Sequence, residues 1–514
     1  VGAYALSAVT QADNVVAIGN SAAYSLTTAS NNLAIGFSAM LVHTTGVRNI
    51  AIGANAMDDT DAGSNSLGSA DNIFIGYDAG GGTWADAASS YNVGIGNYSM
   101  TGALNGANNN TAVGYYALAN VTTADSSVAL GTGALGNLTT GASNIGIGHQ
   151  AMNVHTTGGS NIAIGHGAMD DTNAGSTSLG SRYNIFMGYD AGGGTWADAA
   201  SEYNIGIGDY TLDAALNGAL RNIAIGYEAL TDLTTGDNSI AIGYGAADDV
   251  TTGTQNIAIG TYALSSLTTG AENIAIGDSA LNGNISAAGG YNVAIGPYAA
   301  QTGPSSATNN VLVGNSVMRY YPTGSTNVAI GSYTLEGISG QVASVGSNVV
   351  IGWRSLYRTT FAFYNVVVGD SALMAHKRGN YITALGSGVM QSTVSASNAV
   401  AIGGYAGQYV GHSKEATNTT IVGDLAGQYT TGSNNTFMGY SAGKGGTTSA
   451  PYSSGTNNVV VGAYAFDGFT TAGETTAIGY NAGGSITTGI RNVTVGAFSG
   501  DSLTTGTRNV AIGV

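Results

Sequence analysis

Two runs of acidic residues are the first candidates for chemistry in this chain. The runs are Asp58-Asp59-Thr60-Asp61 and Asp170-Asp171-Thr172-Asn173, with Asp248-Asp249 as a weaker third case. Carboxylate oxygens suit a hard cation such as Ca²⁺. The runs lack the central glycine and the distal glutamate of an EF-hand loop, so we interpret them as solvated loop acids. The 6 histidines, including His43 and His155 before Thr-Thr-Gly, never fall at metal-ligand spacing.

A glycine-rich motif raises the question of nucleotide binding. Residues 131–136 read Gly-Thr-Gly-Ala-Leu-Gly, and this pattern cradles a pyrophosphate where it joins a strand to a helix. No helical pattern follows it, so we expect no dinucleotide site. No Ser-His-Asp arrangement or pair of catalytic carboxylates stands out either. The sequence therefore predicts neither enzyme activity nor a cofactor.

Cations and aromatic residues gather between residues 352 and 386. Four of the chain's 12 Lys and Arg residues lie there. The candidate surface contacts in this segment are Trp353, Arg354, Arg358, Lys377 and Arg378. Such side chains can bind sugars or acidic polymers through stacking and paired hydrogen bonds. The alternative is a wider coil with a differently filled core.

Two tryptophans lie in a long internal duplication. Residues 54–165 are repeated as residues 166–277, and the Gly-rich segments that follow the strands carry Trp84 in one copy and Trp196 in the other. Extra residues in a repeat protein usually loop outward on a binding face. We therefore count Trp84 and Trp196 as candidate surface contacts. The alternative is that each tryptophan folds back and plugs a gap over its coil.

The elements that position these residues follow a period of 17. Asn-Ile-Ala-Ile-Gly or a close variant recurs along the chain, and Gly226, Gly243, Gly260 and Gly277 are spaced 17 apart. A unit this short must bury its apolar face on its neighbours, which is the principle of a solenoid. We predict one continuous all-β repeat domain over residues 1–514, with coils of about 17 residues.

Residues 222–238 show how one coil is built. Ile223 and Ile225 alternate with Ala224, which is the period-two pattern of a strand. A strand with branched side chains on one face and small ones on the other is expected to be buried on both. Which face points into the coil stays open. After a second apolar cluster at residues 229–233, Thr234-Thr235-Gly236 is a turn, where we expect Gly236 to supply a positive φ.

Two further columns follow from stacking the coils. An asparagine lies four residues before most closing glycines, and side-chain amides in such a column can bond along the stack. The predicted structural ladder includes Asn49, Asn161, Asn222, Asn273, Asn327 and Asn509. Tyrosines just after the closing glycine predict a stacked aromatic stripe, with a ligand-binding stripe as the alternative. They include Tyr77, Tyr115, Tyr189, Tyr227, Tyr244, Tyr440 and Tyr480.

Composition excludes several classes of partner. Charged residues make up only 8% of the chain and the formal net charge is -17, which disfavours nucleic acid. There are 0 cysteines, so disulfides and thiolate metal sites are excluded. No apolar run is long enough to span a membrane, and we expect no signal segment or membrane anchor.

The repeat resembles two known kinds of surface protein. Asn-Ile-Ala-Ile-Gly with Gly-rich turns is similar to the YadA-like heads of trimeric autotransporter adhesins. The longer unit, with Leu-Thr-Thr-Gly before it, resembles the shafts of phage tail fibres. The resemblance implies a left-handed β-roll in each chain of a parallel homotrimer. The adhesin repeat is shorter than 17 residues and lacks these insertions, so no functional residue carries over.

Together these features predict a non-enzymatic extracellular fibre shaft. It would display a receptor- or surface-binding tip on a virion or cell, with other copies of itself and a cell-surface glycan or protein receptor as partners. The alternatives are a self-assembling structural filament and a polysaccharide-binding solenoid. Because the sequence starts and stops within a coil, we expect it to be an excerpt of a longer polypeptide.

Overall fold

The protein is described by a computed structural model. It describes residues 2–60, 68–172, 180–283, 289–301, 307–321, 323–339, 341, 343–413, 415–449 and 452–514. The chain divides into two compact units, Val1–Asn256 and Ile257–Val514. Both are built from the same short coil, and the single continuous domain stays a prediction.

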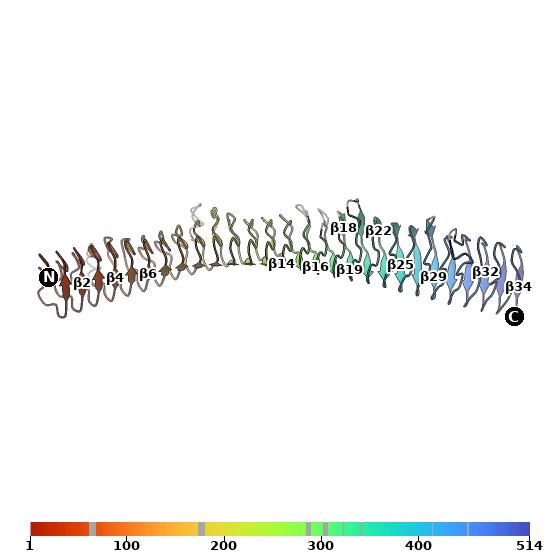
Figure 1. Ribbon diagram of the computed structural model, residues 1–514, viewed down its shortest axis with the longest axis horizontal. Coiled ribbons are helices and arrows are strands. Elements are labelled where there is room, and N and C mark those ends of the chain that lie inside the picture. The colour runs from red at the N-terminus through yellow and green to blue at the C-terminus, as the bar shows by residue number, and fades with distance from the viewer. Residues whose placement is uncertain are drawn as a thin grey trace. The chain divides into compact units, whose positions relative to one another are not determined.

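The first unit is a stack of parallel strands of three residues each. They are β1 (Val16–Ile18), β2 (Leu33–Ile35), β3 (Ile50–Ile52), β4 (Ile73–Ile75), β5 (Val93–Ile95), β6 (Thr111–Val113), β7 (Val128–Leu130), β8 (Ile145–Ile147), β9 (Ile162–Ile164), β10 (Ile185–Met187), β11 (Ile205–Ile207), β12 (Ile223–Ile225) and β13 (Ile240–Ile242). Each strand pairs in register with the next one along the chain, as where Ala224 of β12 lies beside Ala241 of β13. Figure 1 shows these strands following one another in chain order.

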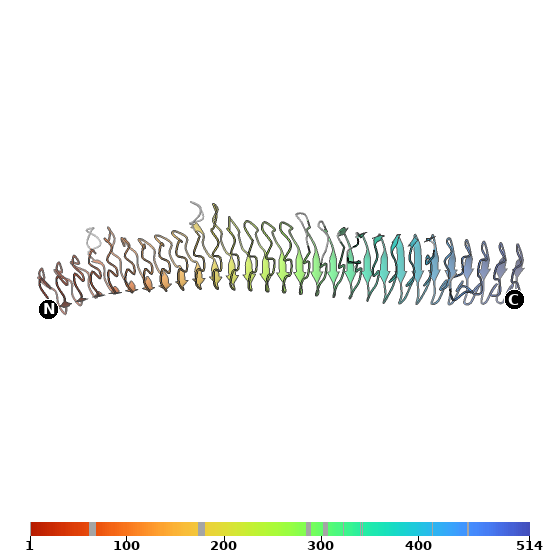
Figure 2. The same cartoon turned by 45° about the horizontal axis from the view of Figure 1, so that its top comes forward.

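The second unit continues the pattern and adds two short ladders. Its main ladder contains β14 (Ile257–Ile259), β15 (Ile274–Ile276), β16 (Val293–Ile295), β17 (Val311–Val313), β19 (Val328–Ile330), β21 (Val349–Ile351), β23 (Val366–Val368), β25 (Ile382–Leu385), β27 (Ala399–Ile402), β29 (Thr420–Val422), β30 (Thr436–Met438), β31 (Val459–Val461), β32 (Thr476–Ile478), β33 (Val493–Val495) and β34 (Val510–Ile512). A second ladder joins β18 (Thr323–Ser325), β20 (Ser344–Gly346), β22 (Phe361–Phe363) and β24 (Arg378–Asn380), and a third pairs β26 (Ala396–Ser397) with β28 (Ala416–Thr417). In Figure 2 the main strands form one side of each coil and irregular turns return the chain.

The structure settles which strand face points into the coil. Ala224 is fully buried, whereas Ile223 and Ile225 on either side of it are half-buried and point outward. The second apolar cluster, with Leu230 and Leu233, fills the interior opposite the strand. The interior of so short a coil holds one layer of side chains, so a small residue faces the leucines and the branched residues turn out.

The turns are made differently from the prediction. Gly226, which closes the strand, has a φ of 131°, and the non-glycine residues Glu228, Leu230 and Asn238 all adopt left-handed φ values. Gly236 does not have a positive φ, so the expected role for it is wrong. It is needed for close approach instead, because a Cβ there would lie 2.7 Å from Leu233 Cδ1 and nearer still to the Gly253 carbonyl oxygen.

No α-helix occurs in the described part of either unit. Each unit is an all-β, parallel β-solenoid with coils of roughly 17 residues, and this part of the predicted fold class is confirmed.

Candidate functional site

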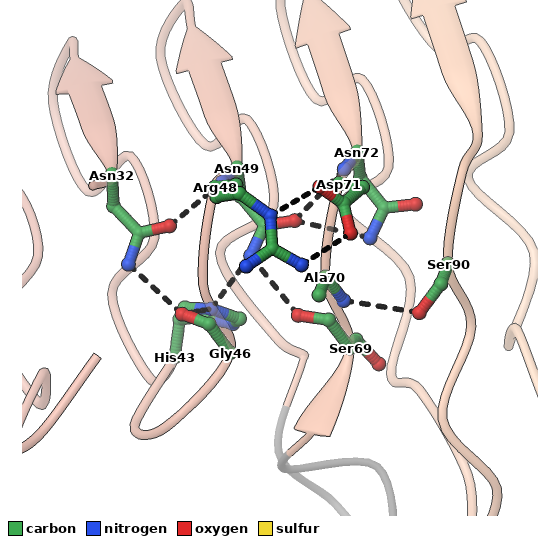
Figure 3. Close-up of polar contacts among 10 residues, drawn as sticks. All are labelled: Asn32, His43, Gly46, Arg48, Asn49, Ser69, Ala70, Asp71, Asn72 and Ser90. Carbon is green, nitrogen blue, oxygen red and sulfur yellow. Dashed lines mark hydrogen bonds and ion pairs between the residues drawn. The ribbon is translucent and has the colours of Figure 1, made fainter. Parts of the chain in front are cut away.

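The asparagine column is a buried, hydrogen-bonded ladder (Figure 3). The backbone N–H of Asn49 donates to Oδ1 of Asn32 in the preceding coil at 2.8 Å. Asn49 Nδ2 donates to the Ser69 carbonyl at 3.0 Å, and its Oδ1 accepts from the backbone N–H of Asn72 at 3.0 Å. Each amide therefore ties a strand to its neighbouring coil and to the returning turn.

The same pattern recurs at the other predicted ladder positions. In each case the side-chain Oδ1 accepts a hydrogen bond from a backbone N–H of the next coil, and this holds for Asn161, Asn222, Asn273 and Asn327. At Asn509 the backbone N–H donates to Oδ1 of Asn492 in the preceding coil. Since these amides are used within the chain, we assign them a structural role. The ion pair beside the ladder, Arg48 Nε to Asp71 Oδ1 at 2.6 Å, is exposed to solvent and therefore adds little to stability.

Trp84 and Trp196 are interior residues, so the expectation that they are surface contacts is wrong. Both are 0% exposed. Each indole N–H donates to a carbonyl four residues earlier, at 3.0 Å, and each ring packs edge-on against a strand phenylalanine. The ring centroids are 6.0 Å apart for Trp84 and Phe74, and 5.9 Å for Trp196 and Phe186. The tryptophans take the place that leucine holds in shorter coils, because burying the large ring stabilises the coil.

Four of the five candidate contacts between residues 352 and 386 meet at one surface of the second unit. Arg354 lies over the rings of Trp353 and Tyr357, with its guanidinium carbon 4.4 Å and 5.6 Å from the ring centroids. Arg354, Tyr357, Arg358 and Lys377 line a groove of about 470 Å³. We call it the arginine groove. It presents cations on aromatic faces, which suits an acidic or sugar ligand.

A buried acid lies near the arginine groove. Burial raises the pKa of the Glu336 carboxyl, and the nearby guanidinium groups of Arg319, Arg358 and Arg354 oppose that rise. Arg378 belongs to a different place, on β24, where its guanidinium carbon lies 5.4 Å from the ring of Phe361. The structure therefore separates Arg378 from the other four candidates.

The tyrosines after the closing glycine form exposed columns of rings. In the first unit, His149, His166, Tyr189, Tyr210, Tyr227 and Tyr244 follow one another with centroid separations from 4.9 to 5.8 Å. His149, His166 and Tyr210 are not among the predicted stripe residues, and Tyr210 lies two positions after its closing glycine, Gly208. The two histidines lie one position after theirs. Their position directly after Gly148 and Gly165 is the signal that would have placed them there.

The acidic runs do not assemble a metal site in the described residues. Burial, followed by the charges of Asp78 and Asp59, raises the pKa of Asp58 to about 6. Burial and the charges of Asp190 and Asp171 do the same for Asp170. Across the described ranges no three His, Asp or Glu side chains gather as metal ligands. Asp61 and Asn173 lie outside those ranges.

The glycine motif at residues 131–136 joins a strand to a turn. Gly131 closes β7 with a φ of 134°, Gly133 has a φ of 68°, and the next regular element is β8. Because no helix N-terminus follows in this described segment, the motif has no pyrophosphate cradle.

The histidines before Thr-Thr-Gly replace a buried leucine. His155 is buried in the column that holds Leu138 one coil earlier. Its Nδ1 lies 3.0 Å from Thr172 Oγ1, and its Nε2 lies 3.0 Å from the Gly158 carbonyl oxygen. A neutral imidazole satisfies both contacts by accepting from the hydroxyl and donating to the carbonyl. Burial lowers the pKa of His155 to about 4, as it does for His43 and His376.

Acid should therefore weaken the fold at His155. Its folded pKa of about 4 lies below the ordinary 6.5, so its contribution is present above pH 6.5 and is lost as the pH falls towards 4. The full loss is roughly 3 kcal/mol. The raised pKa of Asp170 has the opposite effect, because protonation of this carboxyl in acid favours the folded state. The effect of His155 is therefore measured as a difference between a variant and the parent protein. We expect the double variant His155→Leu/Thr172→Val to lose less melting temperature than the parent between pH 7 and pH 4. An equal loss in both proteins would contradict the assignment.

Comparisons with known proteins add no relative. No protein-family model matches the chain, and no curated protein matches it. In the described residues there is also no helix long and apolar enough to cross a membrane.

Proposed function

We propose that the chain is a non-enzymatic extracellular fibre shaft, in which three parallel copies associate through their strands and hold a receptor- or surface-binding tip away from a virion or cell. The observation that carries this proposal is the outward face of the main strands. Each strand offers two outward side chains there, and most are aliphatic, such as Ile207 and Ile242 in the first unit and Ile295 and Ile330 in the second.

This apolar face calls for a partner. The four isoleucines just named are 37% to 39% exposed, and parallel sheets are normally covered on both faces. Covering two such residues per coil is worth roughly 1 kcal/mol per chain, and the gain accumulates along the stack. Large continuous apolar surfaces mark association sites. A second copy offers the same columns at the same spacing, and the resemblance to fibre repeats favours three copies with left-handed coils.

Mass and cross-linking test the proposal together. Sedimentation of the purified chain is expected to give three times the chain mass of 50.9 kDa. The chain has 0 cysteines, so a single introduced cysteine reports its own surroundings. Ile225→Cys on the outward strand face is expected to couple chains through a short bifunctional maleimide. Thr235→Cys, on the exposed returning turn, is the matched control and should remain uncoupled.

Other outcomes separate the alternatives. A species of single-chain mass would rule out both the shaft and the filament. Continuous filaments in electron micrographs would favour the self-assembling filament. Equal coupling of the Ile225→Cys and Thr235→Cys variants would remove the strand face as the interface.

The arginine groove supplies the proposed contact with a receptor. Trp353, Arg354, Arg358 and Lys377 lie on the turns rather than on the outward strand face, so association through the strands leaves them available. Arg378 remains a separate proposed contact on β24. Their cationic and aromatic character favours an acidic glycan or protein surface.

A further inference from the structure

One coil of the first unit lacks the ring that its neighbours carry. The position directly after the closing glycine holds Tyr115 in one coil and His149 two coils later, but Thr132 in the coil between them. The next position holds Gly133, where the preceding coil has Tyr116. The aromatic column is therefore interrupted at this coil, as it also is at Ala54, between Phe37 and Tyr77.

The interruption opens a groove of about 470 Å³. We call it the Thr132 groove. Its lining includes Tyr115, Tyr116, Thr132, Asn137, His149 and Gln150. A Cβ on Gly133 would meet only Gln150 Cγ and Asn153 Oδ1, at 3.6 Å and 3.7 Å, so the floor of the groove is open.

The rings on both sides of the gap line the groove, and Tyr115 packs edge-on against Tyr116 with centroids 4.4 Å apart. Tyr116 stacks on Tyr98 on the side away from the gap, with centroids 4.9 Å apart and planes 12° apart. His149 stacks on His166 in the same way, at 4.9 Å and 20°. Adjacent parallel strands are about 4.8 Å apart, so the flanking rings are separated by roughly 10 Å. That distance admits one further ring in contact with both.

Side-chain amides border the same gap. Asn120 Nδ2 donates to Asn137 Oδ1 at 2.8 Å, which leaves the Asn137 amide nitrogen available as a donor. The side-chain amides of Gln150 and Asn153 make no hydrogen bond to other described residues. Of the described residues between 68 and 172, no Asp, Glu, Lys or Arg lines the groove. A ligand there meets aromatic faces and neutral donors and acceptors.

We propose that the Thr132 groove binds one pyranose ring of a neutral glycan, stacked between the Tyr115–Tyr116 pair and His149 and hydrogen-bonded at its edge by Asn137 and Gln150. A purely apolar ring would leave these amides unpaired. A nucleic acid would bring phosphates to a chain of formal net charge -17, which is unfavourable.

The site is independent of the fibre shaft proposed above. The outward strand residues Val113, Val128 and Leu130 do not line the groove in the described part of the unit. Association through the strand face therefore leaves the groove open. Sugar binding and oligomeric state can be measured on the same sample, so failure of one proposal is distinguishable from failure of the other.

The test is a titration of the full chain followed by NMR saturation transfer. The probes are maltotetraose, cellotetraose and tetra-N-acetylchitotetraose, with tetragalacturonate and an oligothymidylate for comparison. We expect at least one of the three neutral sugars to bind. Thr132→Tyr places in the gap the residue that other coils carry there, and it should weaken that binding by about tenfold or more.

Two further variants make the result specific. Thr261→Tyr adds the same ring directly after Gly260 in another coil, and its affinity should equal that of the parent. Gln150→Ala removes an exposed amide without touching the core, and it should weaken binding several-fold at an unchanged melting temperature. The proposal is overturned if no neutral sugar binds, if only tetragalacturonate or oligothymidylate binds, or if Thr132→Tyr binds as the parent does.

Discussion

Gly226→Ala is expected to destabilise the coil that it closes by at least about 4 kcal/mol. Gly226 has a φ of 131°, a region that side chains with a Cβ rarely adopt. A Cβ there would lie 2.7 Å from the Gly243 carbonyl carbon and closer still to its oxygen. Gly243 cannot move away easily, because its N–H donates to the Ile225 carbonyl at 2.8 Å. The loss should appear in guanidinium denaturation and as faster amide exchange in β12 and β13.

Gly180→Ala is the control for this substitution. A Cβ on Gly180 would have no atom of the described residues within 4 Å, and Gly180 does not have a positive φ. We expect its stability to change by less than about 1 kcal/mol. Because stability in stacked repeats is a sum of local terms, the damage from Gly226→Ala should be confined to nearby coils. A loss from Gly226→Ala no larger than that from Gly180→Ala would show that the coils are not held by this contact.

The spacing of the repeat was enough to predict the coil and its strand. The period of 17 and the alternation at Ile223, Ala224 and Ile225 depend only on sequence, and both describe the parallel ladder that forms. The face turned inward could not be predicted from one coil. It is set by the space inside, where Ala224 and Leu230 share a single layer.

A signal for the inward face does exist between coils. Phe74 occupies the middle strand position where Ala is usual, and its in-register partner in the next strand is Gly94. Phe186 and Gly206 repeat the arrangement. A Cβ on Gly94 would lie 2.5 Å from Phe74 Cδ1. A large side chain in one strand is therefore matched by a glycine at the same position of the next strand, and this matching identifies the strand face that packs inside the coil.

Local sequence preferences could not predict the backbone conformation of the turns or the burial of the two tryptophans. Leu230 has a φ of 52°, although bulky side chains ordinarily avoid the left-handed region. Stacking on neighbouring coils outweighs that local preference, through bonds such as Leu230 N–H to the Ala246 carbonyl at 3.0 Å. Trp84 and Trp196 were predicted to be exposed because glycines flank them, and flanking glycines usually indicate an exposed loop. In the structure both rings are fully buried.

Asn222→Leu is expected to cost roughly 3 kcal/mol or more, because it removes hydrogen bonds that nothing else in the core replaces. Asn222 is fully buried. Its Nδ2 donates to Asn204 Oδ1 at 3.1 Å and to the Gly236 carbonyl at 2.8 Å, and its Oδ1 accepts the Ser239 N–H at 2.9 Å. Leucine fills similar space but leaves the buried Gly236 carbonyl and the Ser239 N–H without a partner, whereas Asn204 Oδ1 keeps the backbone N–H of residue 222 at 3.0 Å. Denaturation monitored by circular dichroism measures the loss.

Asn222→Ser separates the hydrogen bonds from the packing. Serine occurs naturally in this column, where Ser127 Oγ accepts the Asn144 N–H at 3.3 Å and Ser239 Oγ accepts the Asn256 N–H at 3.3 Å. A serine hydroxyl at position 222 can still accept the Ser239 N–H of the next coil, but it cannot reproduce the Nδ2 donor to the Gly236 carbonyl in the turn. We therefore expect Asn222→Ser to cost about 1 to 2 kcal/mol, less than Asn222→Leu although serine is the smaller side chain. If volume rather than hydrogen bonding held the ladder, the order of the two variants would be reversed.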